Sequence, residues 1–87
     1  MHRYALCGLS LRGIYQYALP LLGLNRAGGP NFDRHAELVG IVDPDNERVA
    51  EFYRQIGREI PCYAPQALRR MVRDTQAQTL IVAGPDG

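Results

Sequence analysis

The sequence predicts an α/β fold with a doubly wound parallel sheet that is truncated after about four strands. Apolar runs at 4–9, 36–42, 60–63 and 79–83 alternate with segments of helical periodicity, in the order β-α-β-α-β-α-β. The runs show little polar alternation, which is typical of strands covered on both faces. Strands of this kind are joined by right-handed helical crossovers. The run at 60–63 holds Pro61, which places it at a sheet edge or at a strand start.

Three helices are expected between the strands, each with one apolar face. The first contains Pro20, whose ring and missing N–H would kink the helix or end its first part. Acidic and capping residues at 45–47 crowd the start of the second helix, and Gly57 follows its end. The third begins at Pro65, because the first helical position tolerates proline. The apolar residues of the three faces are Ile14, Ala18, Leu21 and Leu22; Val49, Phe52, Tyr53 and Ile56; and Leu68, Met71 and Val72.

Composition narrows the class of protein. With 87 residues the chain forms at most one small domain, and 46% hydrophobic with 22% charged residues is typical of a globular protein. A net charge of +1 without a basic cluster argues against a nucleic-acid partner. No apolar stretch reaches the roughly 20 residues that span a bilayer, and the start lacks a signal-peptide pattern. We therefore expect a cytoplasmic protein with neither a nucleic-acid nor a membrane partner.

The sequence offers few groups for metal or nucleophilic chemistry. Cys7 and Cys62 lack metal-ligand spacing and are interpreted as reduced, buried residues; a disulfide or a nucleophile is the alternative. His2 and His35 are interpreted as surface or loop residues, and no metal site is predicted. All ten basic residues are arginine, so a mechanism that needs lysine cannot be completed by this chain alone.

A glycine-containing turn is expected between the first strand and the first helix. Residues 8–13 (GLSLRG) match the G-x-G-x-x-G dinucleotide fingerprint with Ser10 in place of the second glycine. Gly8 permits a tight turn, and Gly13 lets the helix pack closely on the strand. Amides at the helix start form an anion site for a pyrophosphate, to which the Ser10 hydroxyl could donate and beside which Arg12 adds a cation. The alternative is an ordinary turn that uses two glycines. The predicted cofactor-binding residues of this turn are Gly8, Ser10, Leu11, Arg12 and Gly13.

Two further features fall at the carboxyl ends of the predicted strands, where parallel α/β sheets bind ligands. Asp43 ends the second strand, where a carboxylate accepts bonds from ribose hydroxyls and repels a 2′-phosphate. With no arginine at 44 or 45, NAD is favoured over NADP. A helix N-cap or an Asx-turn is the alternative role for Asp43, and the two roles are compatible. Gly84, Pro85 and Asp86 follow the fourth strand and would border the nucleotide; a plain turn is the alternative.

Three segments, RYALCGLSLRG, LVGIVDPDNERVAEF and IPCYAPQALRRMVRDTQAQTLIVAGPDG, resemble the amino-terminal part of the Gfo/Idh/MocA oxidoreductases over nearly the whole chain. The resemblance implies a Rossmann-like domain in which the turn at 8–13 and Asp43 hold NAD, and 80–86 pass beneath the nicotinamide ribose. It implies an enzyme that transfers a hydride to or from a small hydroxylated or sugar-like substrate. Ser10 departs from the family pattern, as does Ala64, which stands where the family often has an acidic or hydroxyl helix cap.

The resemblance also implies that 1–87 is a partial dinucleotide-binding domain. The sequence stops before the family's Glu-Lys-Pro segment and before its substrate domain with the catalytic Asp/His pair, so only a longer parent protein would bind substrate. No catalytic residue is predicted, because the candidate tyrosines are interpreted as core or half-buried packing. An unpaired fourth strand would leave the piece marginally stable or associated with another copy as a homo-oligomer. The tyrosines concerned are Tyr15, Tyr17, Tyr53 and Tyr63.

Two other functions fit the same features. A non-catalytic nucleotide-binding or structural Rossmann-like module needs the fold but no hydride chemistry. A fragment of an S-adenosylmethionine-dependent methyltransferase also uses a glycine turn and an acidic residue at the end of the second strand.

Overall fold

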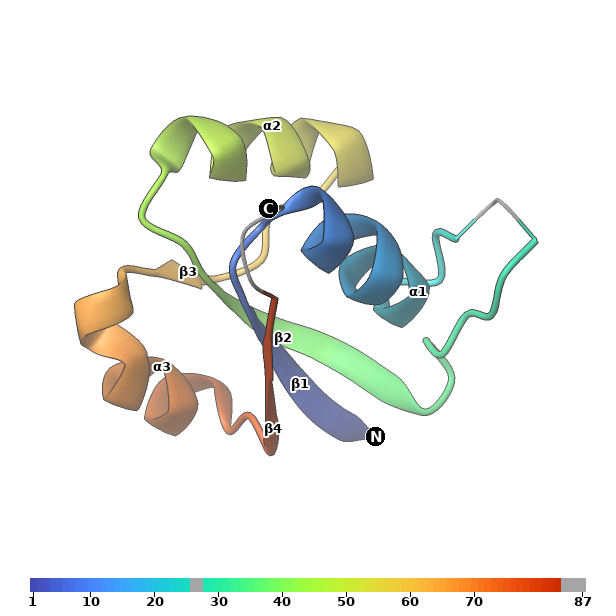
Figure 1. Cartoon of the computed structure of the whole chain (residues 1–87). Coiled ribbons are helices and arrows are strands. Elements are labelled where there is room, and N and C mark those ends of the chain that lie inside the picture. The colour runs from blue at the N-terminus through green and yellow to red at the C-terminus, as the bar shows by residue number, and fades with distance from the viewer. Residues whose placement is uncertain (26–27, 84–87) are drawn as a thin grey trace.

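The computed structural model describes residues 1–25 and 28–83 and places in them a four-stranded parallel sheet (Figure 1). The strands are β1 (His2–Cys7), β2 (Ala36–Val42), β3 (Cys62–Tyr63) and β4 (Thr79–Val82). Their order across the sheet is β3-β2-β1-β4, and all three pairings are parallel. The chain therefore winds outward from β1 in one direction and then returns to pair β4 on its other side. The predicted α/β fold with a doubly wound parallel sheet is confirmed.

Helices cover both faces of the sheet. A π-helix (Gly13–Ala18) runs into α1 (Leu19–Leu21), α2 spans Asn46–Ile56, and a 3₁₀ turn (Pro65–Ala67) leads into α3 (Leu68–Thr75). Figure 1 shows α1 and α2 on one face and α3 on the other. This arrangement places the ends of β1 and β4 at the point where the winding reverses, which is where open α/β sheets form their ligand crevice.

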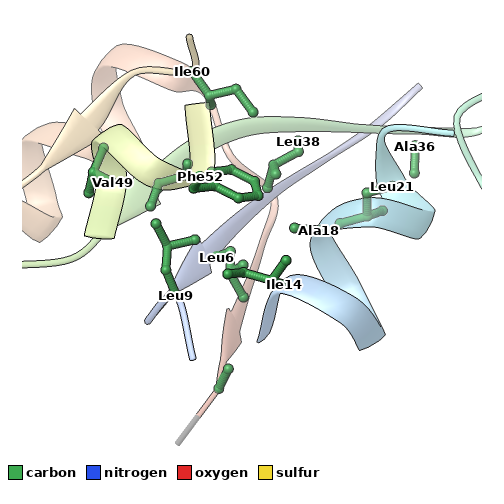
Figure 2. Packing of buried hydrophobic residues seen from close by; sticks show 12 residues of the cluster. Leu6, Leu9, Ile14, Ala18, Leu21, Ala36, Leu38, Val49, Phe52 and Ile60 are labelled. Carbon is green, nitrogen blue, oxygen red and sulfur yellow. The ribbon is translucent and has the colours of Figure 1, made fainter. Parts of the chain in front are cut away.

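The larger part of the core lies between the sheet and the first two helices. Phe52 of α2 is 1% exposed and lies in one cluster with Leu6 of β1 and Leu38 of β2 (Figure 2). A smaller cluster on the opposite face forms around Met71 of α3, which is fully buried. Because each buried side chain of this size contributes about 1.5–3 kcal/mol, the first cluster is the main support of the sheet.

Pro20 disturbs the first helix, as expected. The stretch before it has π rather than α geometry, and the N–H of Leu19 donates to the carbonyl of Ile14, five residues back. Pro20 has no N–H, and its ring crowds the carbonyl four residues earlier in an α-helix. The wider π turn relieves that crowding. The apolar residues predicted for this face are buried or half-buried.

The start and end predicted for α2 are confirmed. The Asp45 side chain accepts hydrogen bonds from the amides of Glu47 and Arg48, and Gly57 follows the helix with a φ of 75°. The apolar residues predicted for the inner face of α2 are buried or half-buried as well. The capping residues and the apolar periodicity thus predict the same helix, and the structure contains it.

β1 lies two residues earlier than predicted. It begins at His2 and ends at Cys7, so Leu9 falls outside the strand. Leu9 is still only 2% exposed, because its side chain belongs to the main core cluster. Its backbone N–H bonds to the Asp43 side chain rather than to a neighbouring strand. The apolar run at 4–9 therefore predicted the burial of Leu9 correctly, but it extends two residues beyond the end of the strand.

β3 is shorter than predicted and lies at the edge of the sheet. It has two residues instead of four, and Pro61 comes just before it. The carbonyl of Pro61 accepts the N–H of Ile41 at 2.9 Å. A proline can supply a carbonyl to a ladder but no N–H, which explains its place at the start of an edge strand.

One face of β4 is open, contrary to the prediction that the strands are covered on both faces. Leu80 and Val82 are 39% and 77% exposed, and in register they lie beside Ala5 and Cys7 of β1. That face is the one on which α3 packs, and α3 has its main contact with the sheet at β2, away from the β4 edge. Leu68 is also exposed, although the helical pattern assigned it to the core.

We expect Asp45→Ala to lower the free energy of unfolding by about 1 kcal/mol, because two amides in the first turn of α2 lose their acceptor. Urea denaturation followed by circular dichroism measures the change. Asp74→Ala makes the same chemical change near the end of α3 and should stay within about 0.5 kcal/mol of the unsubstituted chain. Equal losses in the two variants would contradict the capping role of Asp45.

Candidate functional site

The turn at 8–13 leaves the carboxyl end of β1 and needs glycine at both ends. Gly8 has a φ of 100°, and its amide donates to the carbonyl of Val42 at 2.8 Å. A Cβ on Gly8 would lie 2.6 Å from the carbonyl oxygen of Ala83. A Cβ on Gly13 would lie 2.6 Å from the carbonyl oxygen of Gly8. The two glycines therefore allow the end of β1, the helix start and the chain after β4 to approach one another closely.

Ser10 caps the helical segment 11–21. Its side chain is buried, and its hydroxyl oxygen accepts the N–H of Gly13 at 3.0 Å. Its carbonyl accepts the N–H of Ile14 at 2.9 Å. This role was not predicted from the sequence, although a serine directly before a helix is a recognised N-cap signal. A hydroxyl that accepts a bond keeps its own hydrogen, so the predicted donation to a phosphate is compatible with the cap.

Asp43 ties the turn after β1 to the loop after β2. Its residue is 4% exposed, and its Oδ2 accepts the N–H of Leu9 at 2.8 Å. Its Oδ1 accepts the N–H of Asp45, also at 2.8 Å. The second bond is the Asx-turn considered as the alternative role of this aspartate. Both carboxylate oxygens thus already bond to the backbone, and these bonds compensate for the removal of the charge from water.

Arg48 lies beside this carboxylate and was not predicted as a site residue. Its Nη1 lies 3.7 Å from Asp43 Oδ2, and its Nη2 lies 3.6 Å from Asp45 Oδ2. The Arg48 side chain is 49% exposed, whereas the Asp43 side chain is 1% exposed. The three-residue spacing from Asp45 to Arg48 within one helix turn is the sequence signal that could have found the pair.

An open cleft of about 510 Å³ separates the start of the first helix from α2. Ser10 and Leu11 border it on one side, and Arg48, Glu51 and Phe52 border it on the other. The cleft is therefore next to both the glycine turn and the Asp43–Arg48 pair.

The remaining predicted cofactor-binding residues divide into two groups. Leu11 and Arg12 lie on the exposed surface of the turn, and the Leu11 residue is 64% exposed. Gly84, Pro85 and Asp86 lie outside the described residues. The last described residue, Ala83, donates its N–H to the carbonyl of Cys7 at 3.0 Å. Ala83 therefore lies directly against the glycine turn.

The two cysteines are free thiols, and one of them differs from prediction. Cys7 is half-buried, but Cys62 is exposed on the edge strand β3, so it is not a core residue. Partial burial is the main cause that raises the pKa of both thiols. At Cys62 the hydrogen bond to the Asp43 backbone carbonyl lowers the pKa, whereas the charge of the Asp43 carboxylate raises it. Both thiols are therefore protonated near neutral pH, where a thiol is a poor nucleophile.

Both histidines are surface residues, as expected, whereas one tyrosine that was expected to pack in or near the core is exposed. His2 is exposed and its Nε2 lies 2.6 Å from Thr79 Oγ1, and His35 is exposed in the loop before β2. The Tyr53 hydroxyl donates to a backbone carbonyl, and burial is the main cause that raises its pKa. Tyr15 is 56% exposed at the cleft, which corrects its interpretation as a packing residue.

Comparison of the chain with protein-family models, with curated proteins and with solved structures gave no match. The resemblance to the Gfo/Idh/MocA oxidoreductases therefore stays a prediction that rests on the three quoted segments. Within 1–25 and 28–83, no group of three or more His, Cys, Asp or Glu side chains could hold a metal ion. In the same residues no helix has the length and apolar character that crossing a membrane requires.

We expect Asp43→Asn to lower the free energy of unfolding by about 1–3 kcal/mol, because either the buried Leu9 amide or the part-buried Asp45 amide then faces an NH₂ group instead of an acceptor. Urea denaturation gives the stability. Hydrogen exchange at the Leu9 and Asp45 amides should accelerate, which localises the effect. Asp33→Asn, on an exposed loop, is the matched control and should unfold like the parent chain. Unchanged exchange at both amides would contradict the role of Asp43 described above.

Proposed function

We propose that this chain binds a dinucleotide, NAD, as part of an oxidoreductase that transfers a hydride to or from a small hydroxylated or sugar-like substrate. The observation that carries the proposal is the 2.8 Å bond from the Leu9 N–H to Asp43 Oδ2. It joins the glycine turn after β1 to the acidic end of β2. These are the two elements that a dinucleotide contacts through its pyrophosphate and its adenosine ribose in folds of this class.

The sheet topology supports the same proposal. β1 lies between β2 and β4, so the turn at 8–13 leaves the sheet where the winding reverses. Ligands of open α/β sheets bind at such a point, outside the carboxyl ends of the strands. The helical segment that follows the turn begins at this end of the sheet, and the N-terminal end of a helix favours a phosphate group. The cleft of about 510 Å³ beside the turn provides adjoining space.

The residues present fit a dinucleotide, with one restriction. Gly8 and Gly13 give the turn the tight path typical of a dinucleotide-binding turn, because a Cβ on either residue would meet a backbone carbonyl oxygen of the chain itself. Each carboxylate oxygen of Asp43 uses one acceptor position on a backbone amide and keeps another for a ribose hydroxyl. The side chain is 1% exposed, however, so ribose binding at Asp43 requires the loop after β2 to move outward.

The chain's own part in the reaction is binding and orientation. Hydride transfer is supplied by the nicotinamide when the cofactor is bound, and the protein positions it against the substrate. We assign no catalytic residue and no substrate-binding residue in this chain. Association with a second copy stays a prediction, for which the unpaired edge of β4 is the relevant surface.

We expect the chain to bind NADH and the variant Leu11→Glu to bind it about fivefold more weakly, because the new carboxylate lies on the exposed turn that would hold the pyrophosphate. The fluorescence of NADH is a direct readout, since the chain has no tryptophan. Leu68→Glu introduces the same charge on α3, on the opposite face of the sheet, and should leave the affinity unchanged.

Absence of NADH binding would overturn the proposal in favour of a structural module. Binding of S-adenosylmethionine in place of NADH would instead favour the methyltransferase alternative. Equal weakening by Leu11→Glu and Leu68→Glu would show that the dinucleotide binds somewhere other than the turn at 8–13.

A further inference from the structure

A second cavity, of about 300 Å³, lies between the sheet, the helical segment 11–21 and the loop that precedes β2. Residues from all three parts line it, among them Tyr4 of β1, Tyr17 of the helical segment and Phe32 of the loop. Because Tyr4 and Ala36 lie near the starts of β1 and β2, this cavity is at the amino ends of these strands. The glycine turn is at their carboxyl ends, so the cavity is separate from the site of the proposed function.

The lining of this cavity, the aromatic pocket, is mostly apolar and rich in rings. Among the described residues no Asp, Glu, Lys or Arg lines it, in contrast to the cleft at the glycine turn, which Arg48 and Glu51 border. Two of the chain's five tyrosines and one of its two phenylalanines line the pocket. Aromatic rings attract other rings in offset or edge-to-face arrangements, beyond the effect of the area they bury. The lining therefore fits an uncharged aromatic group better than an aliphatic or a charged one.

Three polar side chains line the aromatic pocket and have hydrogen-bonding capacity to spare. They are the amide of Gln16, the hydroxyl of Tyr17 and the imidazole of His35, none of which bonds to another group in the part of the chain that the structure describes. A few polar groups in a mostly apolar pocket are what orients a small ligand in proteins. Each of these three groups can donate or accept, so they suit a neutral N–H or O–H group of a ligand.

The volume of the aromatic pocket sets the size of the ligand. Pockets for small molecules hold about 300–1,000 Å³, and this one is at the lower limit, which suits one ring or two fused rings. We propose that the aromatic pocket binds a small uncharged aromatic compound that carries an N–H or O–H group, such as an indole or a phenol. The ring of the ligand contacts Tyr4, Tyr17 and Phe32. The ligand also covers part of Phe32, which is 47% exposed without it.

The test is a fluorescence titration of indole with the 87-residue chain. Because the chain has no tryptophan, the emission of indole can be measured apart from that of the protein. We expect indole to bind, and indole-3-carboxylate to bind about tenfold more weakly or less, because the pocket has no cation to compensate for taking its charge out of water.

Substitutions and NMR locate the bound indole. We expect Phe32→Ala to weaken indole binding about fivefold, because it removes one of the rings that line the pocket. Tyr15→Ala, the matched control, removes a 56% exposed ring at the cleft beside the glycine turn and should leave the affinity unchanged. Thermal melting confirms that both variants are folded. In the unsubstituted chain, indole should shift the amide signals of Gln16 and Ala36 and leave those of 8–13 in place.

Several outcomes would overturn the proposal. Absence of indole binding is the first, and equal weakening by Phe32→Ala and Tyr15→Ala is the second. Amide shifts confined to the glycine turn would place indole at the other cleft. Equal affinities for indole and indole-3-carboxylate would show that the assigned ligand class is wrong. A dimer that Phe32→Ala dissociates in analytical ultracentrifugation would show that a second copy of the chain, and not a small compound, occupies the pocket.

Discussion

The structure depends on one buried carboxylate that bonds to the backbone of two different loops. Asp43 holds the Leu9 amide with one oxygen and the Asp45 amide with the other. Bonds of this kind to an ionised group contribute about 1.5–3 kcal/mol each and have well-defined directions. The first fixes where the chain leaves β1, and the second fixes where it leaves β2. Two connections that are far apart in sequence thus acquire one common geometry.

That geometry determines the remaining features of the glycine turn. With Leu9 anchored at Asp43 and its side chain in the core, the chain must turn at Gly8, whose φ of 100° excludes most side chains. Ser10 then lies where its hydroxyl can cap the Gly13 amide and begin the helix. The serine at the position of the second fingerprint glycine is therefore directed inward, toward the helix start. It does not obstruct the outer surface of the turn.

The sequence predicted those parts of the fold that depend on local signals. β2 and α2 agree with prediction because a mostly apolar run, an aspartate cap and a closing Gly57 are local signals, each acting within a few residues. The predicted end of β1 was two residues too late. Leu9 is apolar and buried, but its amide donates to the Asp43 side chain instead of to a neighbouring strand. The open face of Val82 was missed because periodicity cannot tell which part of a sheet a helix will cover. Arg48 was missed because only the turn of α2 brings it to Asp43.

An aspartate at the end of the second strand can either bind a ligand or stabilise the fold. The two roles differ in whether its oxygens accept hydrogen bonds from a ribose or from backbone amides. A carboxylate that waits for ribose hydroxyls must present acceptor positions to solvent, but here the side chain is almost fully buried and both oxygens hold amides. Asp43 therefore acts mainly by fixing the paths of the loops after β1 and β2, and it presents little negative charge to solvent. The exposed charge beside it is that of Arg48, whose position follows from the short loop that Asp43 itself stabilises. The buried Asp43 carboxylate thus stabilises the turn after β1 and also positions Arg48 on the exposed surface beside it.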